Sequence, residues 1–389
     1  MPSPQAATTT LALFCKVVDN YGDIGICWRL ARQLHKEHQI DVQLWVDDLI
    51  SFQRICPEVA TNREAQILDG IRIQYWQNQD ASFTPAEIAD IVIEFFACDI
   101  PPGYIASMAQ CERPPVWINL EGLSAEEWVE GCHTLPSPHP SFSLTKYFFF
   151  PGFNAKTGGL IHERTLDQER RDFLTNQPNS LQTKAQFFEQ LGVLPAEISS
   201  LKVSLFCYPH APVAALFATW SSQEKPILCL VPDGVATEAI QNFLGETPTV
   251  GHHYSRGPLT VRIIPFMPQA DYDKLLWSCD LNFVRGEDSF VRAQWAAKAF
   301  IWHIYPQDEN LHHKKLNAFL QTHLATTHSS KALSLAWNEV HTDINWQDLW
   351  SNMSKDLATI EIQSQGWLEQ MNAIGDLASN LLSFVNTKR

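Results

Sequence analysis

The most chemically suggestive stretch near the N-terminus is a short acidic turn, DNYGDIG at residues 19–25. It follows an apolar run and contains Asp19, Asn20, Gly22 and Asp23. Glycine-bearing turns that lead into a helix commonly bind phosphate through backbone N–H groups. Two carboxylates would repel an anion, so this turn is better suited to a cationic group. An ordinary β-turn, with Asp23 capping the following helix, would explain the same residue types.

A second turn, RGEDS at residues 285–289, combines an arginine with a glycine and the start of a predicted helix. The N–H groups at a helix N-terminus and a nearby guanidinium favour a diphosphate. We expect Gly286 to let the backbone approach a ligand closely. We also expect Asp288 or Ser289 to cap the helix. The alternative is an ordinary surface helix with a capped N-terminus. Acids such as Glu287 and Asp288 are unusual beside an anion site, which indicates a further functional role for one of them.

The second turn and its surroundings are similar to the nucleotide-sugar half of glycosyltransferases with two Rossmann-like domains. Another glycosyltransferase class uses an Asp-x-Asp metal motif, and the letters DYD occur at 271–273. These acids are expected to open a helix, where they favour the helix dipole. The adjacent histidines at 252–253 and 312–313 would not face one another on a helix, so we expect no metal site. His303 lies in an apolar run and is expected to be a buried core histidine.

Alternating strands and helices are predicted to position both turns. The predicted strands cover residues 10–18, 41–48, 89–97, 115–121 and 145–153, and then 202–208, 226–231, 259–266, 281–286 and 299–306. This alternation predicts an α/β fold with two parallel, doubly wound sheets. Ligands of such folds bind at the carboxyl ends of the strands, so we expect the site in a cleft faced by both domains.

The domain organisation follows from a change in composition after the first set of strands. Residues 1–170 are expected to form a first Rossmann-like domain. A polar stretch with several helix breakers, 171–199, is expected to connect it to a second Rossmann-like domain at 200–362. A C-terminal helix at 363–389 is expected to pack back on the first domain. A chain of 389 residues is long enough for two or three domains of ordinary size.

The overall composition narrows the class of protein. Of the residues, 45% are hydrophobic, which argues against disorder. The formal net charge of −15 disfavours sequence-independent nucleic-acid binding. The cysteines contain no C-x-x-C pair, which favours reduced thiols over a disulfide framework or a zinc site. The N-terminus lacks a basic leader, and no apolar run reaches the ~20 residues of a membrane span, so a soluble cytoplasmic protein is expected.

Several long stretches resemble the EarP family, the bacterial protein-arginine rhamnosyltransferases that modify elongation factor P. The resemblance is carried by FCKVVDNYGDIGICWRLARQLH, LWVDD, IEFFACDIP, WINLEGLSAEE, KYFFFPGF, GGLIHER, IPFMPQADYDKLL and RGEDSFVRAQWAAKAFIWHIYPQDEN. It implies a GT-B-type fold, with two Rossmann-like domains facing a cleft. It also implies inverting transfer of L-rhamnose from dTDP-β-L-rhamnose to an arginine guanidinium nitrogen of elongation factor P, with no metal or other cofactor.

The resemblance further implies roles for residues at matching positions. Asp23 matches the catalytic base, Asp19 a second important aspartate in the same turn, and Glu287 another acid needed for activity. The positions that match or adjoin donor contacts are Asn20, Gly22, Phe206, Tyr208, Phe266, Gln269, Tyr272, Arg285, Gly286, Asp288 and Ser289. Independently of the family, Glu121 follows a predicted strand and could contact the acceptor arginine, although a surface acid would look the same.

The implied chemistry is consistent with an acidic turn. A guanidinium has a pKa of roughly 12.5 to 13.8 and a delocalised lone pair, so it is a poor nucleophile. Carboxylates can bind its forked donors, and one can accept a proton as the C–N bond forms, typically worth about 10² to 10⁴-fold. Two rival hypotheses stay open from sequence alone. One is a sugar-nucleotide epimerase on the same fold, and the other is a non-enzymatic protein whose cleft binds a translation factor.

Overall fold

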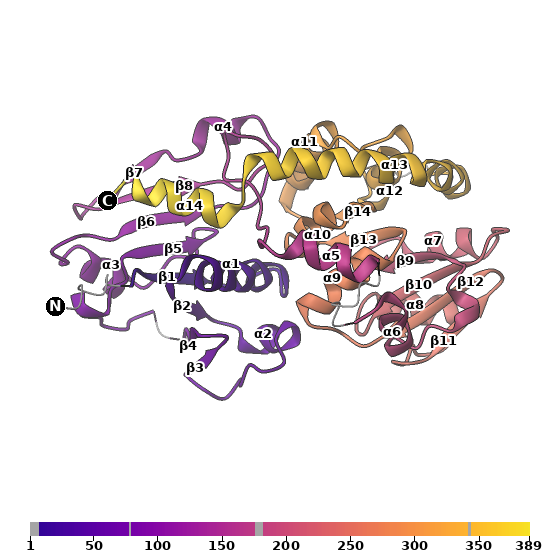
Figure 1. Ribbon diagram of the computed structural model, residues 1–389, viewed down its shortest axis with the longest axis horizontal. Helices are drawn as coiled ribbons and strands as arrows, with labels where there is room; N and C mark the ends of the chain where they lie inside the picture. Colours follow the sequence, from indigo (N-terminus) through magenta and orange to yellow (C-terminus); the bar gives the residue numbers. More distant parts are fainter. Residues whose placement is uncertain (1–7, 78, 176–181, 341–343) are drawn as a thin grey trace. The chain divides into compact units, whose positions relative to one another are not determined.

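The computed structural model describes residues 8–77, 79–175, 182–340 and 344–389. The chain divides into two compact units, one comprising Met1–Arg164 with Met371–Arg389 and the other Thr165–Gln370. Figure 1 shows the strands and helices of each unit. A connection was expected at residues 171–199. Residues 176–181 of this stretch lie outside the described part of the chain, and the others belong to the second unit.

The first unit contains an eight-stranded sheet in the order β3-β4-β2-β1-β5-β6-β8-β7. Its strands are β1 (Thr10–Cys15), β2 (Asp41–Val46), β3 (Ala65–Leu68), β4 (Ile71–Tyr75), β5 (Ile91–Phe95), β6 (Val116–Leu120), β7 (Pro136–Pro138) and β8 (Thr145–Phe149). The pairs from β4 through β8 are parallel, while β3 and β7 pair antiparallel at the two edges. β2 and β5 flank β1 on opposite sides, so the chain after β1 emerges at a topological switch point.

The helices of the first unit are α1 (Gly22–His38), α2 (Leu49–Ile55), η1 (Pro85–Glu87), α3 (Pro102–Met108), α4 (Trp128–Cys132) and α14 (Leu377–Asn386). α1 buries Ile26, Leu30 and Leu34 at helical spacing. α14 lies beside β8 (Figure 1). Phe384 of α14 packs against Tyr147 of β8 at a ring-centroid distance of 5.4 Å. Apolar burial therefore fixes both the helix that follows the acidic turn and the C-terminal helix.

The second unit contains a six-stranded sheet in the order β11-β12-β10-β9-β13-β14. Its strands are β9 (Leu201–Leu205), β10 (Ile227–Pro232), β11 (His253–Arg256), β12 (Leu259–Ile264), β13 (Leu281–Arg285) and β14 (Ala299–His303). β11 pairs antiparallel with β12, and the other pairs are parallel. β10 and β13 flank β9 on opposite sides, which places the residues after β9 and β13 at this sheet's switch point.

The helices assigned to the second unit surround this sheet. They are α5 (Leu166–Leu174), α6 (Lys184–Gln190), η2 (Pro195–Glu197), α7 (Val213–Trp220), α8 (Thr237–Leu244), α9 (Gln269–Ser278), α10 (Asp288–Ala296), η3 (Asp308–Asn310), α11 (Leu311–Thr322), α12 (His328–Trp337) and most of α13 (Trp346–Ile374). The chain returns to the first unit near the end of α13. All ten predicted strands are present, and β3, β4, β7 and β11 are additional.

Two further predictions concern thiols and membranes. All nine cysteines lie in the described part of the chain and are free thiols. Among the described residues, none of the helices combines the length and the apolar character that crossing a bilayer requires.

Candidate active-site residues

The acidic turn of the first unit connects β1 to α1 at the switch point of the sheet. The backbone N–H of Gly22 donates to the carbonyl of Asp19 at 2.7 Å, which closes a β-turn over Asp19–Gly22. Asn20 has a φ of +32°, a backbone conformation that asparagine tolerates better than most residues. The β-turn weighed from the sequence is therefore present, and it brings together Asp19, Asn20, Gly22 and the adjoining Asp23.

The carboxylate of Asp23 is held by the backbone that precedes it. Its Oδ2 accepts hydrogen bonds from the N–H groups of Val18 and Asp19, each at 2.8 Å, and the residue is 5% exposed. The N-cap of α1 is Tyr21, so the alternative in which Asp23 caps this helix is wrong. Two charge-assisted hydrogen bonds instead restrict the orientation of the Asp23 carboxylate.

Gly22 makes room for the second acid of the turn. A Cβ atom at this position would lie 2.7 Å from Oδ2 of Asp19. The turn is also held from the neighbouring strand, because Oδ1 of Asp47, just after β2, accepts the N–H of Val17 at 2.8 Å. Sequence reasoning missed Asp47, although an acid at the end of an adjacent parallel strand was an available signal.

Two buried thiols lie close to the acidic turn. Burial raises the pKa of Cys15, and the neighbouring Cys27 and Asp23 raise it further. Burial likewise raises the pKa of Cys27. Both thiols therefore stay protonated at neutral pH, which leaves the carboxylates as the basic groups of this region.

Glu121 is held in place at the end of β6, separated from β1 by β5. The buried amide of Asn119 accepts the N–H of Ala97 at 2.9 Å and donates to Oε1 of Glu121 at 2.6 Å. Asn119 thus links Glu121 to the loop after β5, where three non-glycine residues have positive φ: Phe96, Ala97 and Asp99. Backbone strain of this kind is often found at functional sites. Sequence reasoning missed Asn119, whose signal was a polar residue in a buried strand.

In the second unit, the guanidinium of Arg285 lies between two aromatic rings. Its Cζ is 4.6 Å from the ring centroid of Phe206 and 4.8 Å from that of Tyr208. Its Nη1 also donates to the carbonyl of Cys207 at 3.2 Å. Cation–π contacts and this hydrogen bond fix the guanidinium at the carboxyl ends of β9 and β13.

The remaining aromatic and polar candidates surround the same point. The ring centroid of Phe206 is 6.3 Å from that of Phe266 and 5.6 Å from that of Tyr272. Gln269 donates to Oδ2 of Asp288 at 3.0 Å. Burial raises the pKa of Tyr272, so its phenol remains a hydrogen-bond donor. The structure therefore gathers the predicted residues of this unit at one place.

The turn after β13 is held by its neighbours on both sides. Gly286 has a φ of +61°, its N–H donates to the carbonyl of His303 at 3.3 Å, and its carbonyl accepts from Nε1 of Trp302 at 2.8 Å. The hydroxyl of Ser289 accepts the N–H of Arg285 at 3.0 Å and donates to the carbonyl of Arg285 at 2.5 Å. Glycine permits the left-handed conformation that this turn requires.

Glu287 is held by a lysine from another helix. It occupies the N-cap position of α10, so the prediction that Asp288 or Ser289 caps this helix is wrong. Oε1 of Glu287 lies 3.1 Å from Nζ of Lys315 on α11, and both side chains are partly buried. The lysine is 28 residues away in sequence, so no local pattern could predict this ion pair.

The acids of the DYD sequence are engaged in ion pairs. Asp273 is buried and accepts two hydrogen bonds from Arg292, at 2.9 and 2.7 Å. Asp271 pairs with Lys274 at 2.9 Å. These pairs support the helix-opening interpretation over metal binding. In the described ranges, no group of three or more His, Cys, Asp or Glu side chains is arranged to hold a metal ion.

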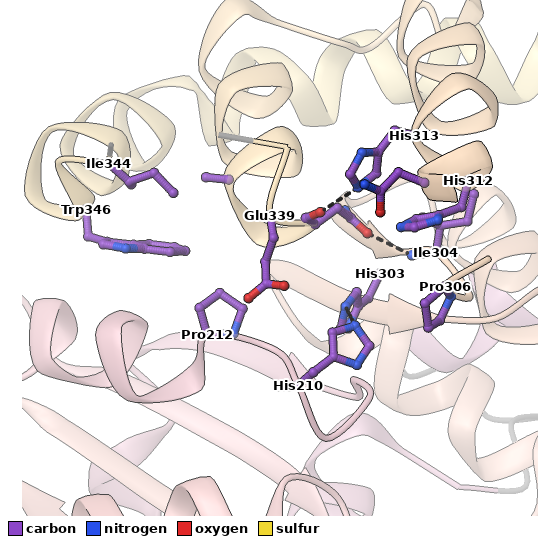
Figure 2. Close-up of a pocket in the computed structure, with 13 residues that line it drawn as sticks. His210, Pro212, His303, Ile304, Pro306, His312, His313, Glu339, Ile344 and Trp346 are labelled. Atoms are coloured by element: carbon purple, nitrogen blue, oxygen red, sulfur yellow. Dashed lines mark hydrogen bonds between the residues drawn. The ribbon is translucent and has the colours of Figure 1, made fainter. Parts of the chain in front are cut away.

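A cavity of about 590 Å³ lies beside the end of β14 in the second unit (Figure 2). Its lining includes His210, His303, His312, His313 and Glu339. His303 is 1% exposed, so the prediction of a buried histidine is confirmed. Its Nε2 lies 3.0 Å from Nε2 of His210.

Each of the two units has an α/β fold with candidate residues at the carboxyl ends of its central parallel strands. Two such units in one chain are typical of the GT-B class of glycosyltransferase folds. The sequence matches the family model described as Elongation-Factor P (EF-P) rhamnosyltransferase EarP over residues 11–386. The chain belongs to this family, which confirms the resemblance seen in the sequence motifs.

Individual relatives agree with this assignment. The chain is 43% identical over 380 residues to the protein-arginine rhamnosyltransferase of Pseudomonas putida, covering 96% of this chain and 98% of that protein. It resembles a solved structure described as the structural basis for EarP-mediated arginine glycosylation of EF-P, with 30% identity and a TM-score of 0.66. That match covers 98% of this chain and 100% of the other.

A more distant structure has the same fold. It is a putative UDP-N-acetylglucosamine 2-epimerase from Listeria monocytogenes, with a TM-score of 0.52 and 13% identity over 98% of this chain and 97% of that chain. At this level of identity the similarity shows the fold alone.

Proposed function

We propose that this enzyme transfers L-rhamnose from dTDP-β-L-rhamnose to an arginine guanidinium nitrogen of EF-P, in the cytoplasm. The transfer inverts the anomeric carbon and uses no metal ion, and it activates EF-P to relieve stalling at polyproline stretches. Membership of the EarP family supports the sugar and the acceptor protein. The observation that carries the proposal from the residues is the pair of carboxylates on one turn at the switch point, with Asp23 held by two backbone hydrogen bonds.

In this proposal Asp23 is the general base. The guanidinium is cationic in water, so a carboxylate cannot deprotonate it at equilibrium. As the bond forms between the guanidinium nitrogen and the anomeric carbon, that nitrogen becomes acidic and its proton passes to Asp23. The bond between the anomeric carbon and the diphosphate oxygen breaks, and dTDP leaves with its electron pair. Asp19 and Glu121 bind the remaining guanidinium donors.

The residues of the second unit bind the donor in this proposal. Arg285 and the N-terminal turn of α10, at Ser289, stabilise the charge that develops on the leaving diphosphate. The aromatic and polar side chains around Arg285 enclose the nucleotide and the sugar: Phe206, Tyr208, Phe266, Gln269 and Tyr272. Glu287 and Asp288 orient the donor, and Asn20 and Gly22 of the acidic turn contact its sugar end.

The test is the intact mass of EF-P after incubation with this enzyme and dTDP-β-L-rhamnose in the presence of EDTA. The proposal predicts a gain of one deoxyhexose, which disappears when the acceptor arginine of EF-P is replaced by lysine. An altered sugar nucleotide formed without EF-P would instead support an epimerase. Binding of EF-P with no consumption of donor would support a non-enzymatic binding protein.

A further inference from the structure

His303 joins the two loops that carry the donor-binding candidates of the second unit. It is the last residue of β14, and its carbonyl accepts the N–H of Gly286 in the turn after β13 at 3.3 Å. Its Nδ1 accepts the backbone N–H of Tyr208, in the loop after β9, at 3.2 Å. One buried residue therefore holds the segments after both β9 and β13.

These contacts determine the tautomer of the imidazole. Because Nδ1 accepts a hydrogen bond from an N–H group, the hydrogen of the neutral ring is on Nε2. Nε2 lies 3.0 Å from Nε2 of His210, so His303 donates and His210 accepts (Figure 2). With hydrogen on Nε2 and Nδ1 engaged by the Tyr208 N–H, His303 has no free lone pair for a metal ion. His303 and His210 are therefore not a pair of metal ligands.

The surroundings of His303 keep its ring neutral. Burial lowers the pKa of His303 well below its ordinary value, and His210, Arg285 and His312 lower it further. A second proton would have to reside on Nδ1, opposite the N–H of Tyr208, where two donors would face each other. The hydrogen bond to Tyr208 is therefore retained through neutral and mildly acidic pH.

Tyr208 transmits this restraint to Arg285. The ring of Tyr208 packs edge-on against His303 at 5.2 Å and lies parallel to His210 at 6.0 Å. The same ring also contacts the Arg285 guanidinium, whose Cζ is 4.8 Å from the Tyr208 ring centroid, and the ring of Tyr305 at 5.7 Å. A shift of the Tyr208 backbone would therefore move one of the two rings that hold Arg285.

We propose that His303 is a positioning residue for the sugar-nucleotide donor, acting through Tyr208 to place the guanidinium of Arg285. This inference rests on the proposed function, because it assumes that Arg285 contacts the diphosphate. His303 itself need not touch the donor. Its role is to supply a buried hydrogen-bond acceptor at the position of Nδ1.

The test compares two polar replacements, each of which places a polar atom near the position of one imidazole nitrogen. In His303→Asn, the side-chain oxygen lies near the position of Nδ1 and can accept the Tyr208 N–H. In His303→Gln, the amide reaches towards the position of Nε2 and leaves the Tyr208 N–H without that acceptor. The affinity for dTDP is measured by calorimetry without EF-P, together with the melting temperature.

We expect His303→Asn to bind dTDP nearly as tightly as the wild type, and His303→Gln to bind about tenfold more weakly, because a buried donor is left unsatisfied. The matched control is His323→Gln. His323 is a second buried histidine of this unit, and it packs against Phe319 and Trp367. This control should lower the melting temperature while leaving dTDP affinity unchanged.

Equal dTDP affinity for His303→Gln and the wild type, or weaker binding by His303→Asn than by His303→Gln, would overturn the positioning role. Failure of the proposed function would look different. The wild-type chain itself would then not bind dTDP or would not modify EF-P.

Discussion

At the scale of single residues, the candidate site depends on how tightly its carboxylates are held. Asp23 accepts two backbone hydrogen bonds, Asp19 lies over Gly22, and Glu287 pairs with Lys315. Carboxylates held in this way need little reorganisation when they meet the acceptor or the donor, which is the condition for effective electrostatic catalysis. Substitutions that displace a carboxylate without removing it therefore test the site most informatively.

Gly22→Ala should slow rhamnose transfer by about tenfold to a hundredfold, because a 1 Å misplacement near the reaction can cost about 10²-fold. Its Cβ would lie 2.7 Å from Oδ2 of Asp19 and would displace that carboxylate. The affinity for dTDP should be unchanged. A methyl group at Gly131, on α4, would meet no atom of the described residues within 4 Å apart from its chain neighbours and its own helix backbone, so Gly131→Ala is the matched control. Equal transfer rates for the two variants would contradict the importance of the Asp19 position.

Lys315→Met should lower the transfer rate by roughly tenfold, since hydrogen bonds to charged groups contribute ~1.5 to 3 kcal/mol. The lysine lies 3.1 Å from Glu287, and its loss would release that carboxylate. Lys314, the preceding residue on α11, is exposed, so Lys314→Met is the control and should behave as the wild type. Lys315→Arg should restore part of the rate. Steady-state kinetics of all three variants would check this, and a normal rate for Lys315→Met would refute the role of the pair.

At the scale of elements, the strands that carry the site residues could be predicted from the sequence, whereas the edge strands that form by pairing with a neighbour could not. β1 and β13 are apolar runs followed by glycine-bearing turns and helices, which local patterns reveal. The missed strand β7 spans three residues, two of them proline, and β11 has the sequence HYSR without an apolar run. Such strands form because a neighbouring strand offers hydrogen bonds, and a local pattern does not record that.

The same limit applies to the site. The turn residues from Asp19 to Asp23 and from Arg285 to Ser289 could be identified because each set is continuous in sequence. The bond between His303 and Tyr208 joins residues that are 95 positions apart, and periodicity correctly predicted only that His303 is buried. Neither the predicted cap by Asp288 or Ser289 nor the alternative cap by Asp23 is present, because each of these side chains has a partner outside the helix that follows its turn.

The link between β5 and β6 leads to a prediction at this scale. Asn119→Leu would remove both the acceptor for the Ala97 N–H and the donor to Glu121. We expect the KM for EF-P to rise by about tenfold, with dTDP affinity unchanged, because Glu121 would lose its orientation. Glu121→Gln should raise the same KM. If Asn119→Leu changed dTDP affinity and left the KM for EF-P unchanged, Glu121 would not be an acceptor contact.

At the scale of the whole molecule, charge and buried histidines set the response to conditions. The net charge of −15 favours a basic partner surface and association that weakens as salt increases. Burial lowers the pKa of His323 to about 3, whereas an unfolded histidine has a pKa of ~6.5. As the pH falls below ~6.5, the unfolded chain binds a proton that the folded chain does not, so stability decreases.

This linkage predicts that the stability of the wild type and that of a His323 variant depend differently on pH. His323 alone should reduce the free energy of unfolding by about 2 kcal/mol between about pH 7.5 and about pH 5. His323→Leu removes that contribution, so its stability should decline less steeply over the same interval, although it is less stable at neutral pH. Urea unfolding at both pH values measures the two slopes. Parallel slopes would show that His323 is not buried as a neutral ring.

The central claim is that Asp23 accepts the proton of the acceptor arginine. The most direct measurement is the single-turnover rate of rhamnose transfer by Asp23→Asn at saturating dTDP-β-L-rhamnose and EF-P, with dTDP affinity measured in parallel. Asparagine is close in size to aspartate but cannot act as the base, so we predict a loss of about 10² to 10⁴-fold in rate with dTDP affinity unchanged. A transfer rate near that of the wild type would contradict the account.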